Sequence, residues 1–178
     1  MNTYNFSLVL GGISSRTPLL EDELYNAGCD DALICFYGST VYLQFDREAA
    51  SFQHAVLSAI QQVESLKGCQ VTSVDAGGYV GISDIAERTG LTKQSISLLK
   101  EGKRGNGNFP SPLYRLTGKQ PLWQWSEVAE WLASYEKIPK HLAEHAELVN
   151  NLNLALQLRD KNVRTKVDEL MEVLPNKY

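Results

Sequence analysis

The sequence has few cysteines, no long apolar run and little positive charge. Its 178 residues include three cysteines, Cys29, Cys35 and Cys69, and none of them forms a CxxC pair. An odd number of scattered cysteines argues against a disulfide framework and fits a reducing compartment. No apolar stretch approaches the roughly 18 residues that cross a bilayer, and the first residues lack the features of a signal peptide. These absences predict a cytoplasmic protein with no membrane contact.

Positive charge is scarce overall but concentrated in the middle of the chain. The formal net charge is −4. Residues 1–78 carry −6 (3 Lys/Arg against 9 Asp/Glu), residues 79–125 carry +4 (7 against 3) and residues 126–178 carry −2 (7 against 9). A basic block between two acidic ones indicates that this block meets a polyanion and that its neighbours do not.

Residues 1–76 alternate strand and helix signals. We expect strands at 4–10, 32–45 and 69–75, the second a hairpin, and helices at 18–28 and 47–68. Asp46 is the expected N-cap of the second helix. The order β-α-β-β-α-β is that of the split βαβ unit, so we predict an α+β protein whose domain 1–76 is ferredoxin-like. This acidic domain is expected to bind a small ligand, a partner protein or its own copy.

Residues 80–105 have the spacing of a helix-turn-helix. We expect Ser83 to cap a first helix, Gly90 to form the tight turn, and Thr92 to cap a second helix. Ala86 is small, which leaves room for two crossing helices. The second helix could then lie in a major groove of double-stranded DNA. A plain helical hairpin within a larger domain is the alternative structural interpretation.

The second helix divides into a buried and an exposed side. Ile96 and Leu99 are three residues apart, so they share the face expected to be buried. Lys, Gln and Ser can hydrogen-bond base edges, and we assign this role to Lys93, Gln94 and Ser97. Phosphate contacts are assigned to the helix N-cap and to nearby cations: Thr92, Lys100, Lys103, Arg104, Arg115 and Lys119.

The residues after the helix pair carry a family resemblance. They include an F-P-x-P segment, a turn, spaced tryptophans and a helix cap: Phe109, Pro110, Pro112, Gly118, Trp123, Ser126 and Trp131. Residues 79–133 thereby resemble the winged-helix module of phage excisionases and mercury-resistance-type regulators. The resemblance implies a winged helix-turn-helix domain over 79–137, with Arg115 and Lys119 on a two-stranded wing. The insertion "GKRGNGN" departs from the family pattern.

The three tryptophans of this module are expected to serve packing. Trp123 and Trp131 are large apolar anchors for a small helix pair, so we predict both in the core. Trp125 alternates with Trp123 in the sequence, and we expect it to face the other way.

Residues 139–178 form an amphipathic segment. Leucine or valine recurs every seven residues from Leu142 to Leu170, as in a helix that pairs with another. We predict a C-terminal dimerisation helix and a homodimer, with these contacts: Leu142, Val149, Leu152, Leu156, Val163 and Leu170. Packing of this segment on the chain's own domains is the alternative.

Catalytic chemistry and metal binding are not predicted. The H-x-x-E-H string at 141–145 lacks an identifiable third zinc ligand. Asp30, Asp31 and Asp46 lack a geometry for metal-dependent cleavage, and no glycine-rich loop has nucleotide-binding spacing. We therefore assign no catalytic residue, no metal and no cofactor, and expect a protein that is not an enzyme.

These observations predict a sequence-specific DNA-binding transcriptional regulator, most simply a repressor, that acts as a dimer. Two alternatives stay open. The chain could be an antitoxin or a defence-system adaptor that binds a partner protein and uses its DNA-binding module for autoregulation. It could also be an architectural protein that bends DNA as excisionases do.

Overall fold

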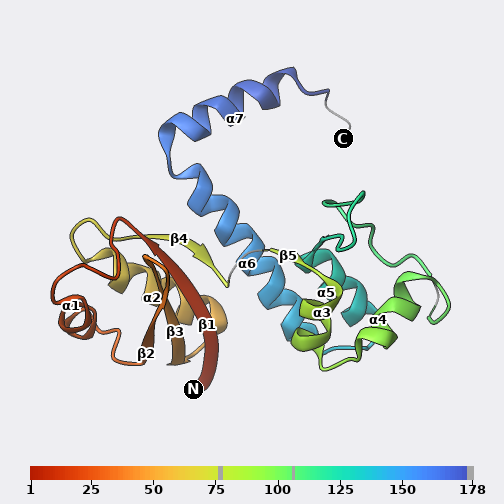
Figure 1. Cartoon of the computed structure of the whole chain (residues 1–178), viewed down its shortest axis with the longest axis horizontal. Coiled ribbons are helices and arrows are strands. Elements are labelled where there is room, and N and C mark those ends of the chain that lie inside the picture. Colours follow the sequence, from red (N-terminus) through yellow and green to blue (C-terminus); the bar gives the residue numbers. More distant parts are fainter. Residues whose placement is uncertain (76–77, 106, 176–178) are drawn as a thin grey trace. The chain divides into compact units, whose positions relative to one another are not determined.

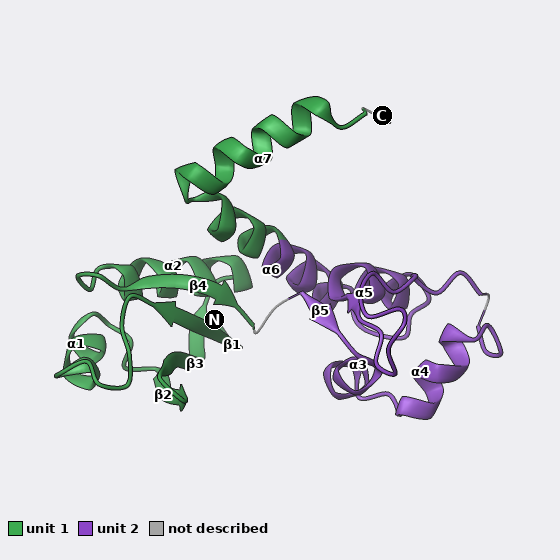
Figure 2. Ribbon diagram, turned by 45° about the horizontal axis from the view of Figure 1, so that its top comes forward, with its two compact units in different colours: residues 1–76, 151–178 green, residues 77–150 purple. Residues whose placement is uncertain are grey.

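The computed structural model describes residues 1–75, 78–105 and 107–175 of an α+β protein (Figure 1). The α+β class predicted from the sequence is confirmed. The chain divides into two compact units, one of residues 1–76 and 151–178 and the other of residues 77–150 (Figure 2). Over the part of the chain that the structure describes, no helix has the length and apolar character needed to cross a membrane.

The first unit contains a four-stranded antiparallel sheet. Its strands are β1 (Asn2–Gly11), β2 (Ala32–Tyr37), β3 (Thr40–Ala49) and β4 (Gln70–Val74), in the spatial order β2-β3-β1-β4. Helix α1 (Leu20–Asn26) follows β1, and α2 (Phe52–Glu64) follows β3. The six elements therefore follow one another along the chain in the predicted order.

The core of this unit lies between the sheet and α2. Alternate residues of β3 are buried, as expected for a strand with one covered face. The rings of Phe6 and Phe45 stack with centroids 5.1 Å apart. Helix α2 buries an apolar stripe that includes Val56, Ile60 and Val63. The buried face of β3 and the buried face of α2 thus form one apolar layer between the sheet and the helix.

The second helix begins later than the sequence predicted, and Asp46 is not its cap. Strand β3 continues to Ala49, so Asp46 lies within the strand, where its carboxylate accepts a hydrogen bond from the Asn5 amide. Ser51 caps α2 instead, its Oγ accepting the N–H of His54 at 3.2 Å. The strand continues because β3 stays paired with β1 as far as Ala49. In this stretch buried Arg47 forms an ion pair with Asp31 at 2.7 Å, which offsets the cost of burying its charge.

The cysteines are free thiols in both buried and partly exposed settings. Cys29 and Cys69 are buried, as expected of small residues in a reduced protein, whereas Cys35 on β2 is partly exposed. Burial raises the pKa of both the Cys29 and the Cys69 thiol to about 11. Neither buried thiol is therefore ionised near neutral pH.

The second unit is helical around one apolar core. Its elements are β5 (Tyr79–Val80), α3 (Ile82–Thr89), α4 (Lys93–Lys100), β6 (Trp123–Gln124), α5 (Trp125–Ser134) and the first part of α6 (Lys140–Leu158). Strands β5 and β6 pair antiparallel. The core draws on every helix of the unit and includes Ile85, Ile96, Leu99, Trp123, Leu132 and Ala146.

The C-terminal segment forms two helices where the sequence predicted one. Helix α6 ends at Leu158, and α7 (Lys161–Val173) begins after Asp160, whose carboxylate accepts the N–H of Asn162 at 2.8 Å. The first part of the heptad stripe packs within the chain, because Val149 is buried and Leu142 packs against the core of the second unit. Packing on the chain's own domain thus accounts for this part of the stripe.

Candidate nucleic-acid interface

Helix α3 starts two residues earlier than predicted, and Ser83 is not its cap. The helix begins at Ile82, and the carboxylate of Asp84 accepts the N–H of Gly81 at 2.7 Å. This contact satisfies a backbone donor that a helix N-terminus otherwise leaves unpaired. Ser83 therefore lies inside the helix, with its side chain exposed. The C-terminus is as predicted, since Gly90 takes the left-handed conformation with φ 71°.

The turn leads into a capped α4, as the sequence predicted. Leu91 packs against the core, and Thr92 Oγ1 accepts the N–H of Ser95 at 3.1 Å. Ile96 is fully buried and Leu99 is 3% exposed, so one face of α4 rests on the core shared with Ile85 of α3. The Thr92 cap thus sets where α4 begins, and the apolar pair sets which face of the helix is buried.

The opposite face of α4 is open to solvent. Lys93, Gln94 and Lys100 are exposed and Ser97 is half-buried. Lys93, Ser97 and Lys100 recur at helical spacing and form one stripe, with Gln94 beside it. The structure thus brings the three predicted base-contacting residues together on one exposed side of a short helix.

The chain after α4 folds back along the helix. The N–H groups of Lys103 and Arg104 both donate to the carbonyl of Leu98, at 2.9 and 3.1 Å. The returning chain lets Arg104 Nη1 donate to Ser95 Oγ at 3.5 Å, and Ser95 is also hydrogen-bonded to Thr92. Arg104 and Thr92 therefore lie together near the α4 N-terminus.

Ser95 was missed by the sequence analysis, although it links two predicted phosphate contacts. The sequence does contain a local sign of it. A residue three positions after a threonine N-cap donates its backbone N–H to the threonine hydroxyl, so the side chain of Ser95 lies next to that of Thr92. The reach of Arg104 to this hydroxyl depends on the returning loop, which no short-range pattern specifies.

Lys103 has a partner in its own loop. Its Nζ lies 2.8 Å from Glu101 Oε2, and both side chains are exposed. Hydrogen bonding to Glu101 raises the pKa of Lys103, and the same contact lowers the pKa of Glu101. A phosphate contact by Lys103 therefore has to replace this exposed ion pair.

The predicted two-stranded wing is reduced to a single bridge. Tyr114 pairs with Leu122, with the Leu122 N–H donating to the Tyr114 carbonyl at 3.0 Å. Proline has no N–H to donate, and Pro112 and Pro121 flank the bridge, which limits its extension. Beyond Leu122 the chain pairs with β5 instead.

The loop closed by this bridge carries the remaining predicted cations. Arg115 and Lys119 are exposed, and Arg115 has a left-handed backbone with φ 56°. The Gly118 N–H donates to the Arg115 carbonyl at 3.0 Å, which forms a tight turn. A shallow hollow at its tip is lined by Arg115, Thr117, Gly118, Lys119 and Gln120.

The tryptophans hold the unit together, and one of them differs from the prediction. Trp123 is 1% exposed and donates from Nε1 to the Pro110 carbonyl at 2.9 Å, while Trp131 packs partly buried against Phe109. Trp125 is 6% exposed, so the prediction that it faces the other way is wrong. The reason is that Trp125, the first residue of α5, packs in the same apolar core as Val80 and Ile85, which lie far from it in the sequence.

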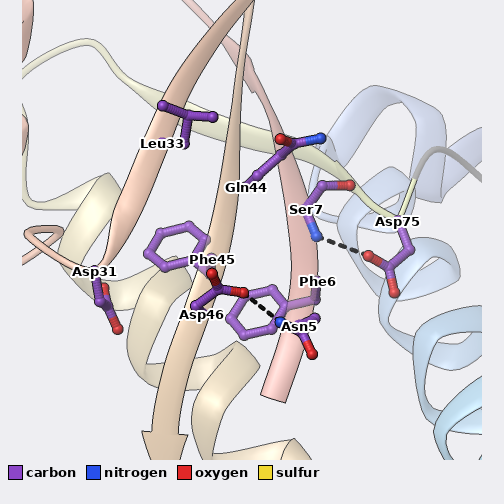
Figure 3. A pocket seen from close by; sticks show the side chains of 9 residues that line it. All are labelled: Asn5, Phe6, Ser7, Asp31, Leu33, Gln44, Phe45, Asp46 and Asp75. Atoms are coloured by element: carbon purple, nitrogen blue, oxygen red, sulfur yellow. Dashed lines mark hydrogen bonds between the residues drawn. The ribbon is translucent and has the colours of Figure 1, made fainter. Parts of the chain in front are cut away.

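The first unit has a polar hollow of about 440 Å³ on its sheet (Figure 3). Its carboxylates already have partners in the chain. Asp46 accepts from the Asn5 amide, Asp75 accepts the Ser7 N–H at 2.7 Å, and Asp31 pairs with Arg47. The hydrogen bonds of Asp46 and Asp75 come from neutral groups, so the lining that the structure describes for this hollow is acidic and includes no cation.

The two histidines of the H-x-x-E-H string lie on one side of α6. The ring centroids of His141 and His145 are 5.6 Å apart. Burial lowers the pKa of His145, and the neighbouring His141 lowers it further. Over residues 1–75, 78–105 and 107–175, no group of three His, Cys, Asp or Glu side chains is arranged to hold a metal ion.

Comparison of the chain with protein-family models, with curated proteins and with solved structures found no match. A functional interpretation therefore depends on the physical features of the surface formed by α4 and the loops beside it. That surface combines the exposed polar stripe of α4, an apolar face that rests on the core, and the cations Lys100 and Arg104. Arg115 and Lys119 lie on the turn closed by the Tyr114–Leu122 bridge. The structure brings no comparable set of cations to the hollow on the sheet.

Proposed function

We propose that the chain is a sequence-specific DNA-binding transcriptional regulator whose α4 lies in the major groove. The observation that carries the proposal is the division of α4 into two faces. Ile96 and Leu99 anchor the helix on the core, while Lys93 and Gln94 are exposed and Ser97 is half-buried. The major groove admits an α-helix, and Gln and Lys bind adenine and guanine edges there.

The charge around α4 supports contacts with the phosphate backbone. Residues 79–125 carry a net charge of +4 in a chain of −4. The proposed phosphate ligands occupy both ends of α4 and the loop after it, and the turn closed by the Tyr114–Leu122 bridge: Thr92, Lys100, Lys103, Arg104, Arg115 and Lys119. Such contacts set the position of a protein on DNA, while base contacts select the sequence.

The proposal includes two assignments of fold. In the first unit β1 and β2 both run antiparallel to β3, so they are parallel to each other with β3 between them. This arrangement supports a ferredoxin-like domain. In the second unit the α3–Gly90–α4 pair and the Tyr114–Leu122 bridge support a winged helix-turn-helix with a very short wing.

A protein partner at the first unit is the second candidate function, as in an adaptor or antitoxin. Strand β2 leaves apolar side chains in solvent, with Leu33 64%, Phe36 48% and Tyr37 83% exposed. Exposed apolar clusters of this kind are typical of interaction sites. Co-purification of a stoichiometric second protein with the full chain would favour this candidate.

The DNA-binding proposal is tested by selecting binding sequences from random duplexes with the full chain. The selected site is then used to compare Gln94→Ala, Arg104→Ala and the exposed control Lys67→Ala of the first unit. Gln94→Ala is expected to lose about 1–3 kcal/mol on the selected site and to relax its base preference. Arg104→Ala is expected to weaken binding to all sequences alike, and Lys67→Ala to change neither property. Failure to enrich any sequence, or unchanged footprints for both variants, contradicts the proposal.

A further inference from the structure

Helix α7 has an apolar face that no residue covers within the part of the chain that the structure describes. No residue of this 13-residue helix is buried. Val163 is 43%, Leu170 61% and Leu174, which ends the helix, 63% exposed. Together with Val167 these residues have the 4-3-4 spacing of a two-helix seam. An isolated helix shorter than about 12–15 residues is marginal in water, so most of its stability must come from packing.

The charges of α7 are divided between its two halves. The first half carries three cations, Lys161, Arg164 and Lys166, and the second half carries three anions, Asp168, Glu169 and Glu172. Within the helix, Arg164 approaches Asp168 only to 4.0 Å, and both are well exposed. A parallel pair of such helices would place like charges side by side, whereas an antiparallel pair places each basic half against an acidic half.

We propose that α7 pairs antiparallel with α7 of a second copy of this chain. The face of α7 is self-complementary in this arrangement, with Val163 opposite Leu174 of the other copy and Val167 opposite its Leu170. A two-fold axis relates the two copies, as in most homodimers. The pairing rests on the proposed DNA-binding function and deepens it, because it assigns the homodimer predicted from the sequence to α7 rather than to the whole heptad stripe.

The expected dimer is weak in the absence of DNA. A helix of 13 residues gives a seam about 20 Å long. Two such helices are too short to bury the area of a standard interface, which is about 1,600 Å². We therefore expect association in the micromolar range, strengthened when two copies bind adjacent half-sites on one duplex.

Sedimentation velocity of the full chain over a concentration series tests the pairing. We expect a concentration-dependent dimer that Leu170→Glu weakens at least tenfold. Leu154→Glu is the matched control, because Leu154 is a helical leucine of α6 that is 51% exposed. Circular dichroism checks that both variants fold. A chain that stays monomeric into the high-micromolar range overturns the proposal and leaves the face to another protein or to a lipid surface.

Cysteine cross-linking tests the direction of the pairing in a Cys35→Ser background. A mixture of Val163→Cys and Leu174→Cys chains is expected to form mixed disulfides, because these positions face each other. Either variant alone is expected to remain uncross-linked, since identical positions lie about 16 Å apart, beyond the reach of a disulfide. Cross-linking of each variant with itself would indicate a parallel pair and overturn the proposal.

The same samples separate this inference from DNA binding. Binding of the wild-type chain to a single half-site without any dimer would reject the α7 pairing alone. A dimer that Leu170→Glu disrupts, in a chain that enriches no DNA sequence, would reject the DNA-binding function alone.

Discussion

Glu64 joins the end of α2 to β4 and to the turn after α6 through a few hydrogen bonds. Its two carboxylate oxygens accept from Arg159 at 2.7 and 2.8 Å, and one of them also accepts the Val71 N–H at 2.9 Å. Hydrogen bonding to Arg159 lowers the pKa of Glu64, against the opposing effect of partial burial. The ionised form of Glu64 is therefore more stable, relative to the protonated form, in the folded chain than in the unfolded one.

This shift gives the unfolding free energy a defined pH dependence. Because the folded-state pKa of Glu64 is depressed, its contribution is present above the unfolded pKa and is lost as the pH falls through the folded pKa. We expect Glu64→Gln to lower the unfolding free energy by about 1 kcal/mol at pH 7, since the pair is partly exposed. The loss should shrink as the pH falls below about 4.

Urea unfolding at several pH values measures this effect. Glu48→Gln, an exposed glutamate of β3, is the matched control. An equal loss for Glu64→Gln at pH 7 and at pH 3 would mean that the ionised form of Glu64 contributes nothing specific.

At the scale of the element, β4 is an edge strand whose outer backbone groups are paired with side chains. Asn153 of α6 accepts the Val74 N–H at 2.8 Å and donates to the Val74 carbonyl at 3.0 Å. Arg159 donates to the Val71 carbonyl at 3.0 Å. These contacts occupy groups that would otherwise be open to pairing with another strand.

Asn153→Ala should release this edge. We expect a loss of about 1–3 kcal/mol in unfolding free energy, because both backbone groups of Val74 lose their partner. Amide hydrogen exchange at Val74 should become faster. Asn151→Ala, an exposed asparagine of the same helix, should have little effect on either quantity. Unchanged exchange at Val74 in Asn153→Ala would show that the amide contributes no protection.

The elements predicted well from the sequence are those fixed by neighbouring residues. The turn at Gly90, the cap at Thr92 and the buried pair of α4 all follow from spacing within ten residues. The misplaced start of α2 and the orientation of Trp125 depend on distant partners. Strand β3 continues past Asp46 because it pairs with β1 as far as Ala49, and the Arg47–Asp31 ion pair in this stretch joins residues 16 positions apart.

Contacts between distant segments were beyond the reach of sequence patterns. Asn153 and Val74 are separated by 79 positions, and an asparagine inside a heptad stripe gives no sign of its partner. The heptad pattern itself was real, but periodicity does not specify what an apolar face packs against. Leu142 packs within the chain, while Leu170 stays exposed.

At the scale of the whole molecule, charge is divided between two segments with different expected partners. Residues 1–78 carry −6 and residues 79–125 carry +4. An acidic segment repels the phosphate backbone, so it limits the ways in which the chain can meet DNA. We therefore expect DNA binding to depend on a few local cations rather than on overall charge.

This division of charge predicts how DNA binding should depend on salt concentration. Each phosphate contact contributes about −0.9 to the slope of log K against log salt concentration. Lys100→Ala should make the slope less steep by about one phosphate contact, because the exposed Lys100 is a proposed phosphate ligand. Gln94→Ala should weaken binding to the selected site at every salt concentration and leave the slope unchanged, since an uncharged side chain releases no counterion.

Fluorescence anisotropy with the selected duplex at several potassium chloride concentrations distinguishes these two behaviours. The exposed Lys67→Ala variant of the acidic segment should match the wild-type slope, because only cations at the interface displace counterions. Equal slopes for Lys100→Ala and the wild-type chain would remove Lys100 from the interface. A flat salt dependence of the wild-type chain would mean that the basic block does not meet the phosphate backbone, and the major-groove position of α4 would then lose its electrostatic support.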